Sequence, residues 1–158
     1  MSAPTVQQIR DTIKTMMLTV ANVGVVHAYE RYTAQQSKLA EFYKDGTSGR
    51  LQGWHIRRVS TRETYIDIGR WVIDHDWQIF GFMAIGDADA TEETFDTLIE
   101  SIRTVFRDDP SMGNLVFNTV IDEKNNQAGM QVEEAVPVLF AGVLCHSARI
   151  GLTTRHML

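Results

Sequence analysis

Cys145 and His146 are neighbours in sequence near the C-terminal end of the chain. Their side chains, a thiol and an imidazole, could react together. Such a pair could act as a nucleophile and its general base. Both residues fall in a run of alternating side chains, and consecutive residues of a strand point to opposite faces. We therefore expect the two groups to diverge, as a small buried thiol beside a core or edge histidine and not as a catalytic centre.

The other histidines offer two acid–base candidates. His27 lies three residues before Glu30, and His75 stands between Asp74 and Asp76. Either could transfer protons, but the first pair has no nucleophile near it, and polar residues are common in a hairpin turn for turn chemistry alone. No two of the five histidines have the i, i+4 spacing of a helical zinc site, and there is no second cysteine. The sequence therefore predicts no catalytic residue, no metal site and no cofactor.

A basic cluster, Arg57, Arg58 and Arg62 with Trp54 nearby, is the remaining candidate for binding. These residues could contact nucleic acid or a phosphate. Charged side chains also protect the edge strand of a sheet from unwanted pairing, and the acidic balance of the chain favours that reading over nucleic acid. A third use, which we favour over nucleic acid, is the positive half of a subunit contact. Its negative half would be Asp87, Asp89, Glu92 and Glu93.

Length and composition indicate one ordinary globular domain over residues 1–158. The chain is 44% apolar and 22% charged, which is usual for a globular protein. Its net charge of −5 argues against bulk nucleic-acid binding, which normally needs a basic excess. One cysteine cannot form a disulfide framework, and neither a run of 18 apolar residues nor a signal-like N-terminus occurs. We expect a cytosolic protein, or one assembled in the cytosol, with no membrane partner.

Helical periodicity predicts two main helices and a short one. Ser2 or Thr5 can cap the first, and Asp89 or Thr91 can cap the second main helix, whose apolar stripe is the clearest in the chain. The helices are expected over residues 4–18, 34–43 and 95–106.

Alternating side chains predict strands in the middle of the chain. A meander of three strands is expected over residues 51–59, 64–73 and 77–85, and shorter extended segments over residues 25–32 and 115–121. Asp74–Asp76 would form the turn before the last strand of the meander. We expect Ile66, Ile68 and Trp71 among the buried residues of this sheet. The polar segment 122–129 is expected to be the most mobile.

The longest alternating run covers residues 136–154 and predicts a single C-terminal strand. At roughly 3.3 Å per residue such a strand would span on the order of 60 Å, so it would have to bend across the sheet or project beyond it. The order of elements predicts an α+β fold, in which an antiparallel β-sheet (the meander plus the long C-terminal strand) packs with two main α-helices.

Six segments of the chain share their residue patterns, and the order in which they occur, with a known family of proteins. They are residues 26–32 (VHAYERY), 53–58 (GWHIRR), 77–85 (WQIFGFMAI), 95–106, 109–114 (DPSMGN) and 138–146 (VLFAGVLCH). In these segments the chain resembles the tail terminator proteins of long-tailed bacteriophages, also called tail completion or minor tail proteins. The likeness covers roughly residues 20–155, and none of its segments is a catalytic signature.

The resemblance implies a structural protein of the virion, assembled in the host cytoplasm, and not an enzyme. Such proteins form a ring, usually a homohexamer, on the head-proximal end of the tail tube. The ring stops polymerisation of the tube and gives the head–neck complex a docking surface. The implied partners are further copies of the chain, the tail tube protein and a neck or head-completion protein, without sequence-specific binding of nucleic acid. Another neck, head–tail connector or tube protein is the first alternative, and a small enzyme or ligand-binding domain using His27, Glu30 and the arginines is the second.

Overall fold

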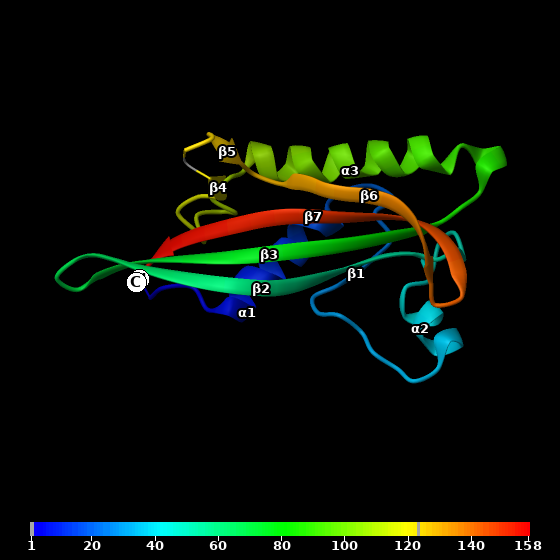
Figure 1. Ribbon diagram of the computed structural model, residues 1–158, viewed down its shortest axis with the longest axis horizontal. Coiled ribbons are helices and arrows are strands. Elements are labelled where there is room, and N and C mark those ends of the chain that lie inside the picture. Colours follow the sequence, from blue (N-terminus) through cyan, green and yellow to red (C-terminus); the bar gives the residue numbers. More distant parts are fainter. Residues whose placement is uncertain (1, 123) are drawn as a thin grey trace.

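The computed structural model describes residues 2–122 and 124–158 and has the predicted α+β fold. A five-stranded sheet has the strand order β1-β2-β3-β7-β6, and a small second sheet pairs β4 with β5. Figure 1 shows the long strands running side by side along the long axis of the molecule. The elements are α1 (Val6–Leu18), β1 (Val25–His27), α2 (Gln36–Phe42), β2 (Gln52–Asp67), β3 (Arg70–Ala84), a 3-10 helix η1 (Asp87–Asp89), α3 (Thr91–Asp108), β4 (Val120–Asp122), β5 (Gln127–Ala128), β6 (Gln131–Phe140) and β7 (Val143–Met157).

The sheet is mostly antiparallel, with one parallel pair. β2 pairs antiparallel with β3, β3 with β7, and β7 with β6, whereas β1 runs parallel to β2, with Val26 opposite Trp54. The parallel pair arises because the chain crosses back through α2 between β1 and β2, and parallel neighbours require such a crossover. The sheet is therefore mixed, where the sequence predicted an antiparallel one.

The meander contains two long strands, and the prediction of three was wrong. The chain turns at Ile68 and Gly69, where Gly69 has a φ of +78°. The segment 74–76, expected as the turn, lies in the middle of β3. Its polar side chains have partners on neighbouring strands, because the Asp74 carboxylate binds the Arg155 guanidinium of β7 (Nε to Oδ1, 2.8 Å). Polar residues that are paired across a sheet do not interrupt a strand.

The prediction of a single C-terminal strand is also wrong, because residues 136–154 include the turn between β6 and β7. Ala141 and Gly142 form its two-residue turn with φ of +52° and +79°. Positive φ at both positions belongs to the type I′ turn that matches the twist of a hairpin. A two-residue turn places Phe140 and Val143 opposite each other, so the residues that face the smaller core change from even numbers on β6 to odd numbers on β7. The sequence alternates on both sides and conceals this change.

Both main helices pack on one face of the sheet, and together they form the larger core. The buried side chains are Ile9, Ile13 and Met17 of α1, Phe95, Leu98, Ile99, Ile102 and Phe106 of α3, and Trp54, Ile56, Trp77, Ile79, Ile150 and Leu152 of the strands. A smaller core on the other face joins Tyr43 and Leu51 to Cys145 beside α2. Its position at one end leaves the middle of that sheet face to polar side chains.

The helix caps were predicted only in part. Thr5 caps α1 as expected, since its hydroxyl accepts from the Gln8 N–H (3.1 Å) and the Gln8 side chain accepts from the Thr5 N–H (2.8 Å). Neither Asp89 nor Thr91 caps α3. Ala90 precedes that helix with a φ of +51° and provides no side-chain cap, because the chain leaves η1 by a left-handed step.

The region after α3 also departs from the prediction. The strand expected over residues 115–121 is confined to β4, and β5 lies within the predicted polar loop 122–129. Glu123 of that loop lies outside the described residues. Asn118 bridges to Arg155 of β7, so the segment after α3 continues the sheet edge where β6 is absent.

Candidate assembly surfaces

The cysteine–histidine pair diverges as predicted. Cys145 is fully buried in the smaller core, and burial raises the pKa of its thiol to about 11. His146 faces the helices, where its Nε2 lies 2.8 Å from the Thr91 hydroxyl and its ring stacks on Phe95. A thiol with so high a pKa is protonated at neutral pH, and the imidazole on the opposite face cannot accept its proton.

His75 and its two acidic neighbours also separate onto opposite faces of β3. The ring of His75 is buried on the helix side, with the Thr61 hydroxyl 2.8 Å from Nδ1 and the His156 ring 5.4 Å away. Burial lowers the pKa of His75, and the neighbouring His156 lowers it further. Asp74 and Asp76 face the other side, paired with arginines. The three residues therefore form no common acid–base site.

His27 and Glu30 are occupied by separate structural contacts. The His27 Nε2–H donates to the Phe42 carbonyl over 2.5 Å, and burial lowers the pKa of this ring. The Glu30 carboxylate accepts from the Tyr32 hydroxyl (2.6 Å) and lies 3.6 Å from the Arg57 guanidinium. These contacts fix the loop that follows β1 against the edge of β2.

The three arginines predicted as a positive surface do not stay together. Arg57 and Arg58 line an open recess of about 530 Å³ at the edge of β2. Arg62 lies farther along β2 toward the turn, paired with the Asp76 carboxylate, which also accepts from Ser60. The recess, which we call the basic recess, is lined by Arg10, Tyr29, Glu30, Arg31, Tyr32, Ile56, Arg57 and Arg58.

The four predicted acidic residues lie in η1 and the first turn of α3, and all four are exposed. Asp89 pairs with Arg50 at 3.0 Å. We call the other three, Asp87, Glu92 and Glu93, the acidic corner. Figure 1 shows this start of α3 at the end of the molecule opposite the β2–β3 turn. The positive and negative groups are thus kept apart within one chain, as they must be if they meet only between chains.

An apolar tip on the β2–β3 hairpin is the feature that the sequence prediction missed. The hairpin projects beyond the helices (Figure 1). On β3, Val72 is the residue nearest the hairpin turn that still pairs with β7. We call residues 65–71 the arm tip. Ile68 at its turn is 94% exposed, and Tyr65, Ile66 and Trp71 are exposed beside it. Three of these residues were expected in the core, because an exposed apolar residue in a strand looks the same in sequence as a buried one.

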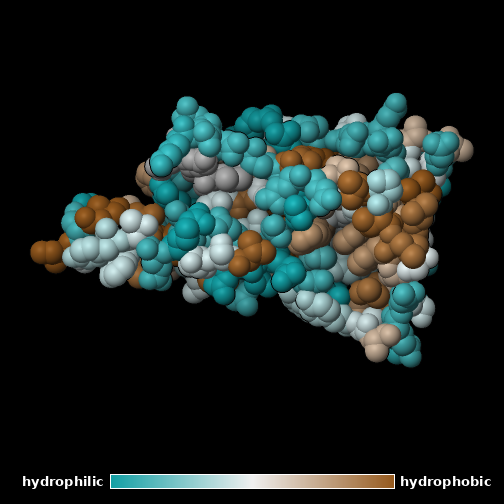
Figure 2. Space-filling view, viewed as in Figure 1, coloured by the Kyte–Doolittle hydropathy of each residue, from teal (hydrophilic) through white to brown (hydrophobic). Residues whose placement is uncertain are grey.

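The opposite end of the molecule carries apolar surface as well. Leu139 and Leu144 face each other across the β6–β7 hairpin and are 74% and 56% exposed, with Val136 exposed on the same strand. Val136 points to the opposite face of β6 from Leu139, because the two are an odd number of residues apart in a regular strand. We call Leu139 and Leu144 the distal patch. Figure 2 shows hydrophobic surface at both ends of the molecule and mainly hydrophilic surface between them. Exposed apolar patches of this kind mark surfaces that contact other molecules.

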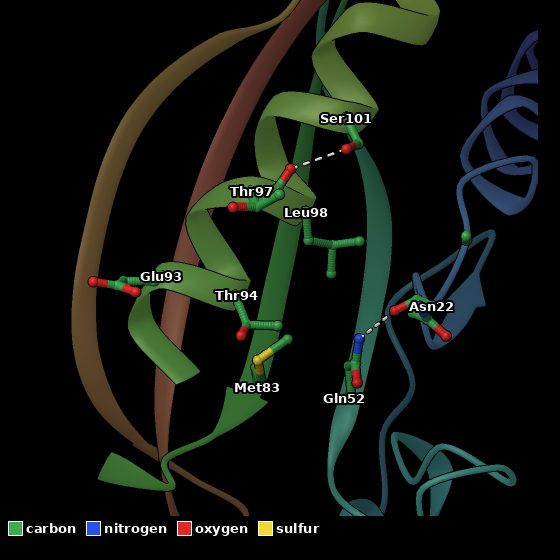
Figure 3. Close-up of a pocket in the computed structure, with 9 residues that line it drawn as sticks. Asn22, Gln52, Met83, Glu93, Thr94, Thr97, Leu98 and Ser101 are labelled. Carbon is green, nitrogen blue, oxygen red and sulfur yellow. Dashed lines mark hydrogen bonds between the residues drawn. The ribbon is translucent and has the colours of Figure 1, made fainter. Parts of the chain in front are cut away.

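Another hollow, a cleft of about 540 Å³, lies between α3 and the start of β2 (Figure 3). Thr94, Thr97 and Ser101 of α3 line one side of the cleft, and Gln52 and Asn22 line the other. The Ser101 hydroxyl donates to the Thr97 carbonyl (3.0 Å), and the Gln52 amide donates to the Asn22 carbonyl (2.5 Å). These polar groups of the lining therefore form hydrogen bonds within the chain.

Within residues 2–122 and 124–158, no group of three or more His, Cys, Asp or Glu side chains could hold a metal ion. Among the helices of the same residues, none is long and apolar enough to span a bilayer.

No protein-family model matches the sequence, and no curated protein matches it.

Proposed function

We propose that this chain is a structural subunit of a closed ring, the tail terminator of a long-tailed bacteriophage. The ring would cap the head-proximal end of the tail tube, stop polymerisation of the tube and dock the head–neck complex. The proposal rests on the six segments that resemble this family and on one structural observation, the two unlike ends of the molecule.

The unlike ends carry the argument for assembly. The arm tip projects Ile68 into solvent at one end, and the distal patch exposes Leu139 at the other. If the arm tip of one copy contacts the distal patch of the next, the contact is heterologous and leaves the same two surfaces free at each end of the chain of subunits. Heterologous contacts generate a ring when the rotation between copies closes, and an open filament when it does not.

The two sides of the sheet also suit a ring that binds different partners on its two faces. On one side α1 and α3 cover the strands with helix surface. On the other side the middle of the sheet carries ion pairs between strands, such as Arg149 with Glu133 (2.9 Å). We propose that one of these sides contacts the tail tube protein and the other contacts a neck or head-completion protein. Further copies of the chain, most simply six in all, would complete the ring.

This role needs no catalytic residue, cofactor, membrane contact or sequence-specific nucleic-acid contact, and it places the protein at the tail–neck junction after assembly in the host cytoplasm. The alternative is another neck, head–tail connector or tube-type protein. A contact of the arm tip with the next copy would favour this alternative if the rotation between copies does not form a closed ring. The product would then be an open tube or filament.

A tube-length assay tests the proposed function. The tail tube protein of the same phage is polymerised with increasing amounts of this chain, and tube lengths are measured by negative-stain electron microscopy. We expect shorter tubes, each with a ring at one end. Tubes of unchanged length without bound rings would overturn the proposal, and incorporation of the chain along the tube would support the tube-type alternative.

A further inference from the structure

The basic recess gathers four arginines from three parts of the chain. Arg10 comes from α1, Arg31 from the loop after β1, and Arg57 and Arg58 from β2, with Glu30 as the one carboxylate in the lining. Four positive charges against one negative charge is a marked local excess in a chain whose net charge is −5. Such a concentration of one sign in a concave surface favours an anionic ligand.

Two of these four positive charges are positioned by aromatic rings and not by carboxylates. The Arg10 guanidinium lies 5.7 Å from the centre of the Trp77 ring, and its buried Nε has no hydrogen-bond partner. The Arg31 guanidinium lies 4.2 Å from the centre of the Phe42 ring. Cation–π contacts fix the orientation of a guanidinium and leave its charge uncompensated.

Ion pairing accounts for only one of the four arginines. Arg57 lies 3.6 Å from Glu30, whereas Arg10, Arg31 and Arg58 form no ion pair with any residue that the structure describes. Three of the four guanidinium groups are therefore not neutralised by a carboxylate of the described chain, and their charge is available to an anionic group from outside it.

The acidic corner has the complementary charge. Asp87, Glu92 and Glu93 form no ion pair within the described part of the chain, unlike the neighbouring Asp89, which binds Arg50. The corner also adjoins the distal patch, because Glu92 lines a small hollow with Pro137 and His146, the cross-strand pair next to Leu139 and Leu144 on the same face of the hairpin. A subunit that presents its distal patch to a neighbour therefore presents its acidic corner to that neighbour as well.

We infer that the basic recess is the socket for the acidic corner of a second copy of this chain. The inference rests on the proposed ring and specifies one of its contacts. Carboxylates of the corner would bind the guanidinium groups of Arg10, Arg31 and Arg58 with charge-assisted hydrogen bonds. The contact is heterologous, because each copy offers its recess to one neighbour and its corner to the other.

Reciprocal charge reversal tests the socket. One variant reverses the recess (Arg31→Glu with Arg58→Glu), and the other reverses the corner (Glu92→Arg with Glu93→Arg). A matched control, Lys38→Glu with Arg107→Glu, changes the net charge of the chain as the recess variant does. Circular dichroism confirms the fold of each, and light scattering coupled to gel filtration measures assembly across a concentration series.

We expect each reversed variant to assemble at least tenfold more weakly than the wild type and the control to assemble normally. An equimolar mixture of the two reversed variants should recover rings with strict alternation and an even number of subunits. In that mixture every recess meets a corner of opposite charge. Recovery on mixing cannot be explained by misfolding of either variant.

The outcomes separate the socket from the ring. Rings from both reversed variants, or no recovery on mixing, would overturn the socket and leave the ring intact. If such variants form rings but no longer bind a labelled single-stranded oligonucleotide that the wild type binds, the recess takes nucleic-acid phosphates and the socket is likewise overturned. A wild type that is monomeric at every concentration would overturn the proposed ring itself.

Discussion

Tyr65 and Trp71 face each other across the tip of the β2–β3 hairpin, with their ring centres 5.0 Å apart. Val72 is the last residue of β3 that pairs with β7, so this aromatic pair holds together the part of the hairpin that has no third strand. Cross-strand aromatic pairs stabilise a hairpin by about 0.2–1 kcal/mol. The pair therefore gives the arm tip a defined shape at a modest cost in exposed apolar surface.

Replacing Trp71 with alanine should loosen the arm tip without unfolding the protein. Hydrogen exchange should accelerate in residues 63–71, because the local opening there loses about 0.2–1 kcal/mol of stabilisation. Exchange in the core strands should stay unchanged, as measured by mass spectrometry of the same peptides in both proteins. A large fall in the melting temperature would show instead that the tip contributes to global stability.

Ile68→Asp should abolish self-assembly and leave the monomer stable. The side chain is 94% exposed, so the free energy of unfolding of the monomer should change by less than about 0.5 kcal/mol. A charge would be unfavourable in an apolar contact with the next subunit. Sedimentation velocity measures the loss, with Ile68→Val as the control that keeps the apolar surface. Normal assembly of the Asp variant would exclude the arm tip from the contact.

His55 should make the protein sensitive to mild acid. Its ring is buried, stacks on Phe80 and accepts at Nδ1 from the Tyr43 hydroxyl (3.0 Å). Burial lowers the pKa of His55 from 6.5 to about 4. Between those values the unfolded chain binds the proton and the folded chain does not, so the free energy of unfolding falls as the pH falls.

The expected loss from His55 is on the order of 3 kcal/mol between pH 6.5 and pH 4. Urea unfolding at a series of pH values measures it. In His55→Phe the slope over this window should be shallower. The remaining dependence is due to His27, His75 and His156, whose pKa values burial also lowers. An equal slope in both proteins would assign the acid sensitivity elsewhere.

Asp74→Ala should destabilise the fold far more than removal of an exposed ion pair. Asp74 is 7% exposed, and its two carboxylate oxygens accept hydrogen bonds from the Arg155 guanidinium over 2.8 and 2.9 Å. Its removal leaves a guanidinium half-buried without that partner, at a cost of about 3 kcal/mol. Asp67→Ala breaks the exposed pair with Arg70 and should have no measurable effect on the urea midpoint.

The sequence predicted what local patterns determine. The stripe of α3, from Phe95 to Phe106, and the Thr5 cap of α1 depend on neighbours a few residues away, and both are found. The turns were misplaced because their positions depend on distant residues. Asp74 reads as a turn residue until Arg155 of β7 is known to bind it.

The candidate surfaces were predicted unevenly for a related reason. Charge made Arg58 and Glu92 visible in sequence as candidates for the two halves of the proposed contact. The arm tip was not visible in the sequence, because Ile68 is apolar. Its exposure arises because β3 extends beyond the end of β7, whose pairing with β3 stops at Val72. The Ile68-Gly69 dipeptide between two polar residues, Asp67 and Arg70, is the one local signal that could have located this turn.

Direct measurement of the assembled state tests the central claim, that the unlike ends of the chain join head to tail in a closed ring. The purified protein is examined across a concentration series by light scattering coupled to gel filtration, and the assembled fraction is imaged by negative-stain electron microscopy. We predict one discrete oligomer with a ring-shaped outline and rotational symmetry, six subunits being the expected number. A strict monomer at every concentration, or an open filament, would contradict the claim.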